Sequence, residues 1–141
     1  MKLVNAKMRL NDPRLMDILA PSMFNPTPKR VAARAATYRQ ETGVEACACQ
    51  IDDIDVGLIL FSVSEDTAVI HQIATARTHR GVGVGRFMIE QVMEGFHLLA
   101  MAAETDDDAV GFYRRCGFTV ERCGAIGGRA RYRCRRERPT P

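Results

Sequence analysis

The sequence predicts a single α/β (α+β) domain, with a mixed, mostly antiparallel sheet of about six or seven strands flanked by about four helices. Short apolar or alternating segments between residues 44 and 74 are joined by polar turns, which is typical of an antiparallel meander. A glycine-rich turn, an amphipathic segment and an apolar strand then follow, an order that indicates a right-handed parallel crossover. Two further strand-like segments, separated by glycines, complete the chain.

The periodicity of apolar residues places each element. Strands alternate at every second residue or are continuously apolar, and helices repeat about every 3.6 residues. Asp12-Pro13 and Thr27-Pro28 indicate helix starts, because a side chain can cap the first turn and proline suits the first helical position. Strands are expected at residues 2–8, 44–51, 56–63, 67–74, 98–103, 118–123 and 130–135, and helices from residues 13, 28, 84 and 109.

Length and composition narrow the class of protein. A chain of 141 residues suits one core, so we expect residues 1–141 to form a single domain. No apolar run approaches the roughly 20 residues that a membrane span needs. Residues 1–20 carry scattered charges and no apolar signal region, so we expect a cytoplasmic protein without a membrane partner.

Cysteine spacing and charge distribution limit the metals and partner molecules that the chain is expected to bind. The five cysteines are odd in number and lack Cys-x-x-Cys spacing, so we expect buried thiols and no metal site. The net charge of +3 is concentrated in the last strand, where Arg131, Arg133 and Arg135 share one face. That face is either solvated or attracts an acidic substrate, a partner subunit or nucleic acid. No aromatic residues interleave it, so nucleic acid is not an expected partner.

The stretch from residue 80 to 86 predicts an anion-binding site. Glycines at alternate positions let the backbone approach a ligand. The helix that begins at Val84 directs its unpaired N–H groups and the positive end of its dipole at this turn. A phosphate group can bind there, with added charge from the two arginines. The expected phosphate-binding residues are Arg80, Gly81, Val82, Gly83, Val84, Gly85 and Arg86.

Three motifs occur in order in the central part of the chain. A strand ends at Ile73-Ala74-Thr75, and Arg80-x-x-Gly83-x-Gly85 follows. A later helix carries Ala109-Val110-Gly111-Phe112-Tyr113 and closes at Cys116-Gly117-Phe118. In this order and at these separations, the motifs resemble those of the GCN5-related N-acetyltransferases, the GNAT superfamily, in its small single-domain bacterial type.

The resemblance implies the acyl-CoA N-acyltransferase fold, in which two central parallel strands splay apart. It divides the chain into an acceptor-side half (1–67), an acetyl-CoA-binding core (68–118) and C-terminal strands (119–141). Acetyl-CoA would be the co-substrate, with its pyrophosphate on the glycine turn and its pantetheine in the splay. The resemblance adds these residues to the coenzyme site: Ile73, Ala74, Thr75, Asp106, Ala109, Phe112 and Tyr113. At position 106 the family often has asparagine, whereas an ionised aspartate cannot donate a hydrogen bond.

For catalysis, the resemblance implies transfer of an acetyl group to a primary amine by direct attack in a ternary complex. A backbone N–H near Ile73 or Ala74 would polarise the thioester carbonyl, and Tyr113 would protonate the departing thiolate. Val69 replaces the glutamate that serves many members as base. Candidates for the base are His71, which shares that face, and Glu104, at the end of the next strand. A base acting through a water chain and no dedicated base are further alternatives.

Several alternatives stay open. The chain could be a non-catalytic acyl-CoA-binding sensor or interaction domain, or an acyltransferase that uses a different acyl-CoA. The acceptor amine is not identified. The segment Met23-Phe24-Asn25, which lies between prolines, is either a flap facing the substrate or an ordinary packed loop. An exposed last strand, residues 130–135, could pair with that of a second copy and form a homodimer.

Overall fold

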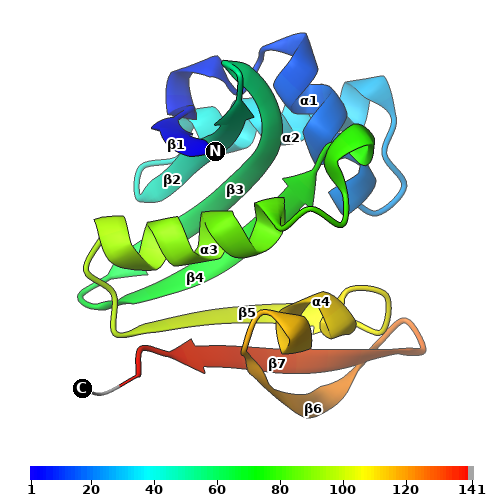
Figure 1. Cartoon of the computed structure of the whole chain (residues 1–141). Coiled ribbons are helices and arrows are strands. Elements are labelled where there is room, and N and C mark those ends of the chain that lie inside the picture. Colours follow the sequence, from blue (N-terminus) through cyan, green and yellow to red (C-terminus); the bar gives the residue numbers. More distant parts are fainter. Residues whose placement is uncertain (140–141) are drawn as a thin grey trace.

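The computed structural model describes residues 1–139. Its seven strands form one sheet in the order β1-β2-β3-β4-β5-β7-β6 (Figure 1). The strands are β1 (Lys2–Asn5), β2 (Val44–Ile51), β3 (Ile54–Ser64), β4 (Thr67–Thr75), β5 (Ala100–Asp106), β6 (Thr119–Ile126) and β7 (Arg129–Glu137). The helices are α1 (Pro13–Leu19), α2 (Pro28–Gln40), α3 (Val84–Gly95) and α4 (Val110–Arg115).

Every pair of neighbouring strands is antiparallel except β4 and β5, which run parallel. Strands β2, β3 and β4 form the predicted meander, and α3 makes the crossover from β4 to β5. The two helix starts are capped as expected: Asp12 accepts a hydrogen bond from the N–H of Arg14, and Thr27 from that of Arg30. The predicted fold, a mostly antiparallel mixed sheet with four helices, is confirmed.

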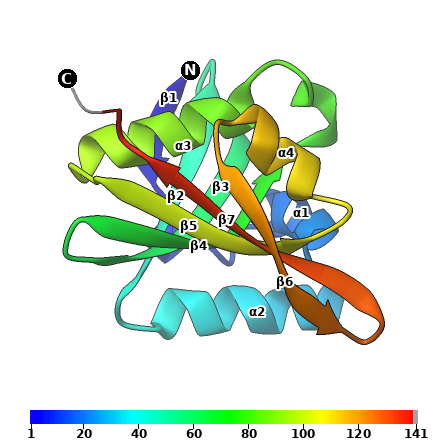
Figure 2. The ribbon, with the colours of Figure 1, turned by 90° about the horizontal axis from the view of Figure 1, so that it is seen from below.

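The sheet carries an apolar core on each face. Helices α3 and α4 cover one face, and α1 and α2 lie on the other (Figure 2). Alternation along β2 divides its side chains between the two cores. Cys47 and Cys49 belong to the core under α3, whereas Val44, Ala46 and Ala48 belong to the core under α1 and α2. The sequence predicted this division.

Strands β4 and β5 pair only at their beginnings, which leaves the rest of β4 with an open edge. Their parallel register runs from Thr67 opposite Ala100 to Val69 opposite Ala102 and then stops. Figure 1 shows the two strands starting side by side and then diverging. Within the described chain, residues 70–75 of β4 therefore have no strand partner on the β5 side. The splay expected between the two central parallel strands is present.

Some element boundaries differ from the prediction. Strand β5 spans residues 100–106 rather than 98–103, because pairing with β7 carries the extended backbone through Asp106. Strand β1 ends at Asn5, and a 3-10 turn (Lys7–Arg9) takes the residues predicted for its second half. Strands β6 and β7 are both longer than predicted, which shortens the turn between them.

The last strand is not an edge of the sheet. Strand β7 lies between β5 and β6, so the edges are β1 and β6. The expectation of an exposed last strand is wrong, since both sides of β7 already pair within the chain. The hypothesis of a homodimer therefore gains no support from β7.

No helix in the part of the chain that the structure describes is long and apolar enough to cross a membrane. Nor does that part bring together three or more His, Cys, Asp or Glu side chains in an arrangement that could hold a metal ion. All five cysteines are free thiols; four are buried and Cys123 is half-buried. Burial raises the pKa of Cys47 to about 11, so this thiol is protonated at neutral pH.

Candidate active site

The glycine-rich turn lies between β4 and α3. Gly81 and Gly83 have φ angles of 80° and 87°, which are left-handed and favour glycine. Arg80 is exposed, and so is the side chain of Val82, at 56%. Helix α3 begins at Val84 without a side chain that caps it. The first N–H groups of this 12-residue helix are therefore available to an anion at the turn.

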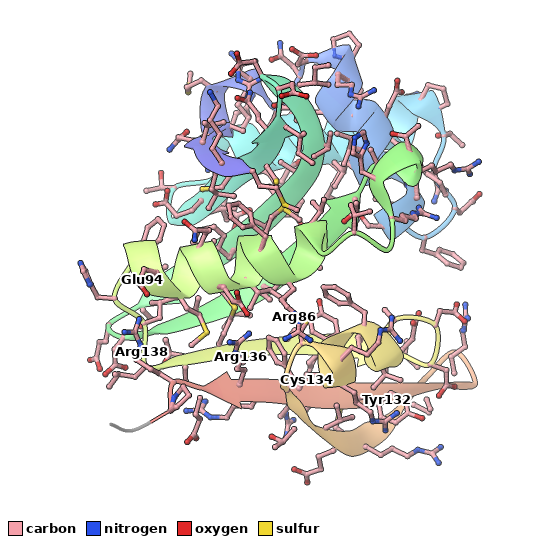
Figure 3. The ribbon with its side chains drawn as sticks, in the orientation of Figure 1. Arg86, Glu94, Tyr132, Cys134, Arg136 and Arg138 are labelled. Atoms are coloured by element: carbon pink, nitrogen blue, oxygen red, sulfur yellow. The ribbon has the colours of Figure 1, made fainter. Side chains whose placement is uncertain are left out.

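Gly85 and Arg86 hold α3 against α4. A Cβ atom at Gly85 would lie 2.5 Å from the ring of Phe112, so the packing of α4 requires glycine here. Arg86 extends from α3 toward α4 (Figure 3), where its guanidinium donates a hydrogen bond to the carbonyl oxygen of Arg115. Carbonyl oxygens in the last turn of a helix attract a cation. Both residues were expected to bind phosphate, and these contacts with α4 were not predicted from the sequence.

The open edge of β4 contains Ile73, Ala74 and Thr75. These residues are half-buried and keep their pairing with β3 on the other side. Because β5 has moved away, an extended molecule with amide groups could pair with this edge as an added strand. The edge ends at a surface cavity of about 220 Å³, between Thr75 and the α1 residues Arg14 and Asp17.

Tyr113 is buried in α4, with 6% of its surface exposed. Its ring centroid lies 5.2 Å from those of Phe112 and Phe118, both in edge-to-face geometry. Burial raises the pKa of Tyr113 well above its ordinary value, so the phenol stays protonated at neutral pH. Burial also raises the pKa of the nearby Cys116 thiol, which makes this cysteine a poor nucleophile.

Asp106 closes the turn that leads from β5 to α4. Its Oδ1 accepts hydrogen bonds from the N–H groups of Asp108, at 3.0 Å, and Ala109, at 3.3 Å. Asp107 accepts a hydrogen bond from the hydroxyl of Tyr132 on β7 at 2.5 Å. The three aspartates therefore stabilise the turn before α4 and connect it to β7, and no side chain caps α4.

His71 lies in a β-bulge of β4, beside the point where β4 and β5 part. Phe61 of β3 pairs with Ile70, and Leu60 pairs with Gln72, so His71 is the extra residue. Bulges are common next to active sites, where they redirect a side chain. No feature of the sequence marks this bulge, because it depends on the register between two strands.

Contacts of His71 place it on the α2 side of the sheet. Its Nε2 lies 2.6 Å from Oγ of Ser62, and its ring centroid lies 6.2 Å from that of Tyr38 in α2. The residue is otherwise exposed. The serine occupies one ring nitrogen, which leaves Nδ1 without a side-chain partner among residues 1–139.

The residue after His71, Gln72, forms a hydrogen-bond network that was not predicted from the sequence. The Gln72 side chain donates to Oγ of Ser22 at 2.9 Å, and Arg34 donates to Oε1 of Gln72 at 3.4 Å. The guanidinium of Arg34 also lies 6.0 Å from the ring centroid of Tyr38. This network joins the loop before α2, and α2 itself, to β4. The only signal in the sequence was that Gln72 follows His71.

The segment between α1 and α2 exposes an aromatic side chain. Phe24 is 84% exposed, and Asn25 has a left-handed φ of 50°. The alternative of an ordinary packed loop is therefore wrong for Phe24. The same segment contains Ser22, which contacts β4 through Gln72.

Glu104 points to the same face of the sheet from β5. Alternation buries Ala103 and Thr105 and leaves Glu104 exposed. Its Oε1 lies 3.9 Å from the guanidinium of Arg133, directly opposite on β7, which is a weak, solvent-exposed pair. His71 and Glu104, the two candidate bases, therefore lie on one face of the sheet and on opposite sides of the splay.

The model of the acetyltransferase (GNAT) family matches residues 13–118, which is most of the chain. The chain belongs to the acetyltransferase (GNAT) family. Acyl transfer is therefore the class of chemistry of this GNAT domain, and the motifs noted in the sequence lie within the matched range. No curated protein sequence matches the chain closely enough to count as a relative.

Solved structures share the fold of this GNAT domain. An aminoglycoside 6'-N-acetyltransferase complexed with coenzyme A has a TM-score of 0.75 at 14% identity, over 100% of this chain and 99% of that one. A GNAT family acetyltransferase from Elizabethkingia anophelis with acetyl-CoA bound has a TM-score of 0.66 at 14% identity, over 96% and 97%. The PaiA N-acetyltransferase from Thermoplasma acidophilum, in complex with coenzyme A, has a TM-score of 0.65 at 12% identity, over 98% and 100%. At these identities, the similarity shows the fold.

Proposed function

We propose that this GNAT domain transfers an acetyl group from acetyl-CoA to a primary amine by direct attack in a ternary complex. The observation that carries the proposal is the parting of β4 and β5 after Val69 and Ala102, next to the exposed turn that opens α3. Family membership supports acyl transfer, and three proteins of the same fold were solved with coenzyme A or acetyl-CoA.

The glycine turn binds the pyrophosphate of the coenzyme in this proposal. The N–H groups at the start of α3 point toward the turn, and Gly81 and Gly83 shape it. Arg80 is exposed and adds positive charge. The side chain of Arg86 is engaged by α4, so Arg86 contributes through its backbone N–H.

The open edge of β4 binds the pantetheine arm. Backbone groups of residues 73–75 pair with its two amides, and an N–H near Ile73 donates to the thioester carbonyl. Phe112 and Ala109 border the arm from the α4 side. The carboxylate of Asp106 accepts hydrogen bonds from backbone N–H groups of the turn before α4. Aspartate therefore holds the shape of this turn here, whereas asparagine in many family members bonds to the pantetheine arm.

The chemistry balances without a covalent enzyme intermediate. The acceptor nitrogen bonds to the thioester carbonyl carbon and loses a proton, and the C–S bond then breaks. Tyr113 donates a proton to the departing thiolate. Burial disfavours the thiolate as well as the phenolate, so the transfer stays feasible although the pKa of Tyr113 is raised. The products are the N-acetylated amine and coenzyme A.

His71 is the stronger candidate for the base that accepts the proton of the amine. Ser62 and Tyr38 hold its ring, and one ring nitrogen stays accessible. Glu104 is exposed, and its carboxylate lies 3.9 Å from the guanidinium of Arg133, so it already has a charged partner. Substitution of His71 by glutamine should lower kcat/KM by about 100-fold or more, whereas Glu104→Gln should leave kcat/KM close to the wild-type value.

The proposal is tested by calorimetric titration with acetyl-CoA and by release of free thiol across a panel of amines. We expect saturable binding, and one thiol released for each amine acetylated. Binding without turnover on any amine would favour the sensor or interaction domain, and competition among acyl-CoA donors would reveal a different donor. Absence of binding would overturn the proposal.

A further inference from the structure

The α2-side face of the sheet is uncovered over β5, β7 and β6. The core beneath α1 and α2 takes its strand residues from β1 to β4 and, within residues 1–139, none from the other three strands. Along β7, Tyr132 and Cys134 belong to the opposite core (Figure 3), so Arg131, Arg133 and Arg135 face the uncovered side. This face borders the splay, because β5 forms one side of both.

Two of these three arginines have carboxylate partners. Arg133 lies 3.9 Å from Glu104, and Nε of Arg135 lies 3.1 Å from a carboxylate oxygen of Glu137. Arg131 forms no ion pair or side-chain hydrogen bond within the part of the chain that the structure describes, and its Nε is buried. A buried N–H donor without an acceptor costs free energy, so a ligand that brought an acceptor to Nε of Arg131 would be favoured.

Asp106 lies opposite Arg131 in the β5–β7 register but does not pair with it. The Oδ1 atom of Asp106 already accepts hydrogen bonds from the backbone of Asp108 and Ala109. The planar guanidinium of arginine matches the two oxygens of a carboxylate. A ligand with a carboxylate would therefore supply the acceptor that the chain does not.

Arg131 lies at the open end of the splay. Strands β4 and β5 part after Val69 and Ala102, and Arg131 is opposite the last residue of β5. Glu104 is a diagonal neighbour of Arg131, at about 7–8 Å between Cα atoms. The face therefore presents Glu104 near the expected position of the acceptor amine and, a few ångströms farther on, an arginine without a partner.

We infer that the acceptor is a small amine that also carries a carboxylate. Arg131 binds the carboxylate, and the amine lies between Glu104 and His71, next to the thioester. Arg133 and Arg135 keep their own carboxylate partners and take no part. This inference rests on the proposed function, since it identifies the class of the second substrate of that reaction.

The test compares amines that carry a carboxylate with the same amines in which an amide replaces it. The pairs are alanine with alaninamide, and ω-amino acids of increasing length with their amides. Thiol release is measured for the wild type, Arg131→Gln and Arg135→Gln. We expect Arg131→Gln to raise the KM for the carboxylate-bearing amines about ten- to hundred-fold and to leave the KM for acetyl-CoA and for the amides unchanged. Arg135→Gln, on the same face of the same strand, should match the wild type.

A second measurement does not require turnover. Each amine is titrated calorimetrically into protein saturated with coenzyme A, and we expect a carboxylate-bearing amine to bind the wild type and Arg135→Gln but not Arg131→Gln. The inference is overturned if no such amine binds, if the amides bind and react equally well, or if Arg131→Gln keeps the wild-type preference. Failure of the proposed function would show separately, as absence of heat with coenzyme A itself, and would overturn both.

Discussion

At the scale of single residues, the exposed side chain of Val82 offers access to the proposed phosphate site. It lies between two left-handed glycines and contributes little to either core, so it can be changed without disturbing the fold. Tyr113 is the opposite case, because its ring is packed on all sides while its hydroxyl is the group with a proposed chemical role. Substitutions at these two residues therefore test coenzyme binding and catalysis separately.

Substitution Val82→Glu should weaken acetyl-CoA binding about ten- to hundred-fold, because it places a carboxylate beside the pyrophosphate. An acidic side chain at a helix N-terminus is favourable for the helix itself, so stability should not fall. Val82→Gln, which has nearly the same size and no charge, is the control. Calorimetry checks the prediction, and equal affinities for the two variants would contradict a phosphate at this turn.

Substitution Tyr113→Phe should lower kcat by roughly 100-fold or more while leaving the KM for acetyl-CoA nearly unchanged. Only the hydroxyl is removed, so the packing of the ring is kept. Tyr132→Phe, which removes a hydroxyl bound to Asp107, is the control and should retain kcat. Because burial raises the pKa of Tyr113, activity should not decline through ionisation of this phenol below about pH 10. A kcat within twofold of the wild type would show that the Tyr113 hydroxyl is not needed for catalysis and that the residue serves only in packing.

At the scale of elements, Asp55 joins the N-terminal segments to β3. Its carboxylate accepts two hydrogen bonds from the guanidinium of Arg9, at 3.0 and 3.2 Å, and one from the side chain of Gln50. Its backbone carbonyl accepts from Arg14 of α1. The Arg9 hydrogen bonds hold the pKa of Asp55 below its usual value. Through these contacts, Asp55 positions α1, which borders the open end of β4.

Substitution Asp55→Asn should lower the free energy of unfolding at pH 7 by about 1–3 kcal/mol, measured by urea denaturation. The pKa of Asp55 is lowered in the folded state, so its contribution is complete above about pH 4 and is lost as the pH falls through the lowered value. The difference between wild type and variant should therefore shrink between about pH 4 and pH 2. Asp53→Asn, at a solvent-exposed pair with Lys2, should behave like the wild type. A difference that is independent of pH would contradict this account.

At the scale of the whole molecule, the splay leaves β1–β4 and β5–β7 joined at few places. They meet in the short parallel pairing, in the packing of α3 against α4, and through arginines near the end of the chain (Figure 3). Arg138 donates to the carbonyl oxygens of Met93, within α3, and Leu98, after it, and the guanidinium of Arg136 lies 3.8 Å from the carboxylate of Glu90 in α3. A coenzyme bound in the splay would add a further connection between the two groups of strands.

Acetyl-CoA at 100 times its Kd should stabilise the fold by about 2.7 kcal/mol and raise Tm by roughly 8–11 °C. Amide hydrogen exchange should slow in residues 70–75 and 103–106, which line the splay, and should change little in β2. The Val82→Glu variant should lose about half of the shift in Tm or more at the same ligand concentration. Protection confined to strands away from the splay would place the ligand elsewhere.

Local patterns in the sequence determined the element types, the two-sided alternation of β2, the capped starts of α1 and α2, and the glycine turn before α3. Each depends on residues a few positions apart, and short-range geometry is the same in any fold. The three family motifs added the order of the central elements and the expected splay.

Only the tertiary structure decided the contacts that depend on long-range register. Pairing across the sheet made β6 an edge in place of β7, and put His71 in a bulge beside Ser62. The approach of α4 to α3 explains why position 85 is glycine. The carboxylates near Arg131 bind other groups, which leaves Arg131 unpaired within the described chain. Such contacts join residues tens of positions apart, whose meeting is determined by how the whole sheet assembles and by no local pattern.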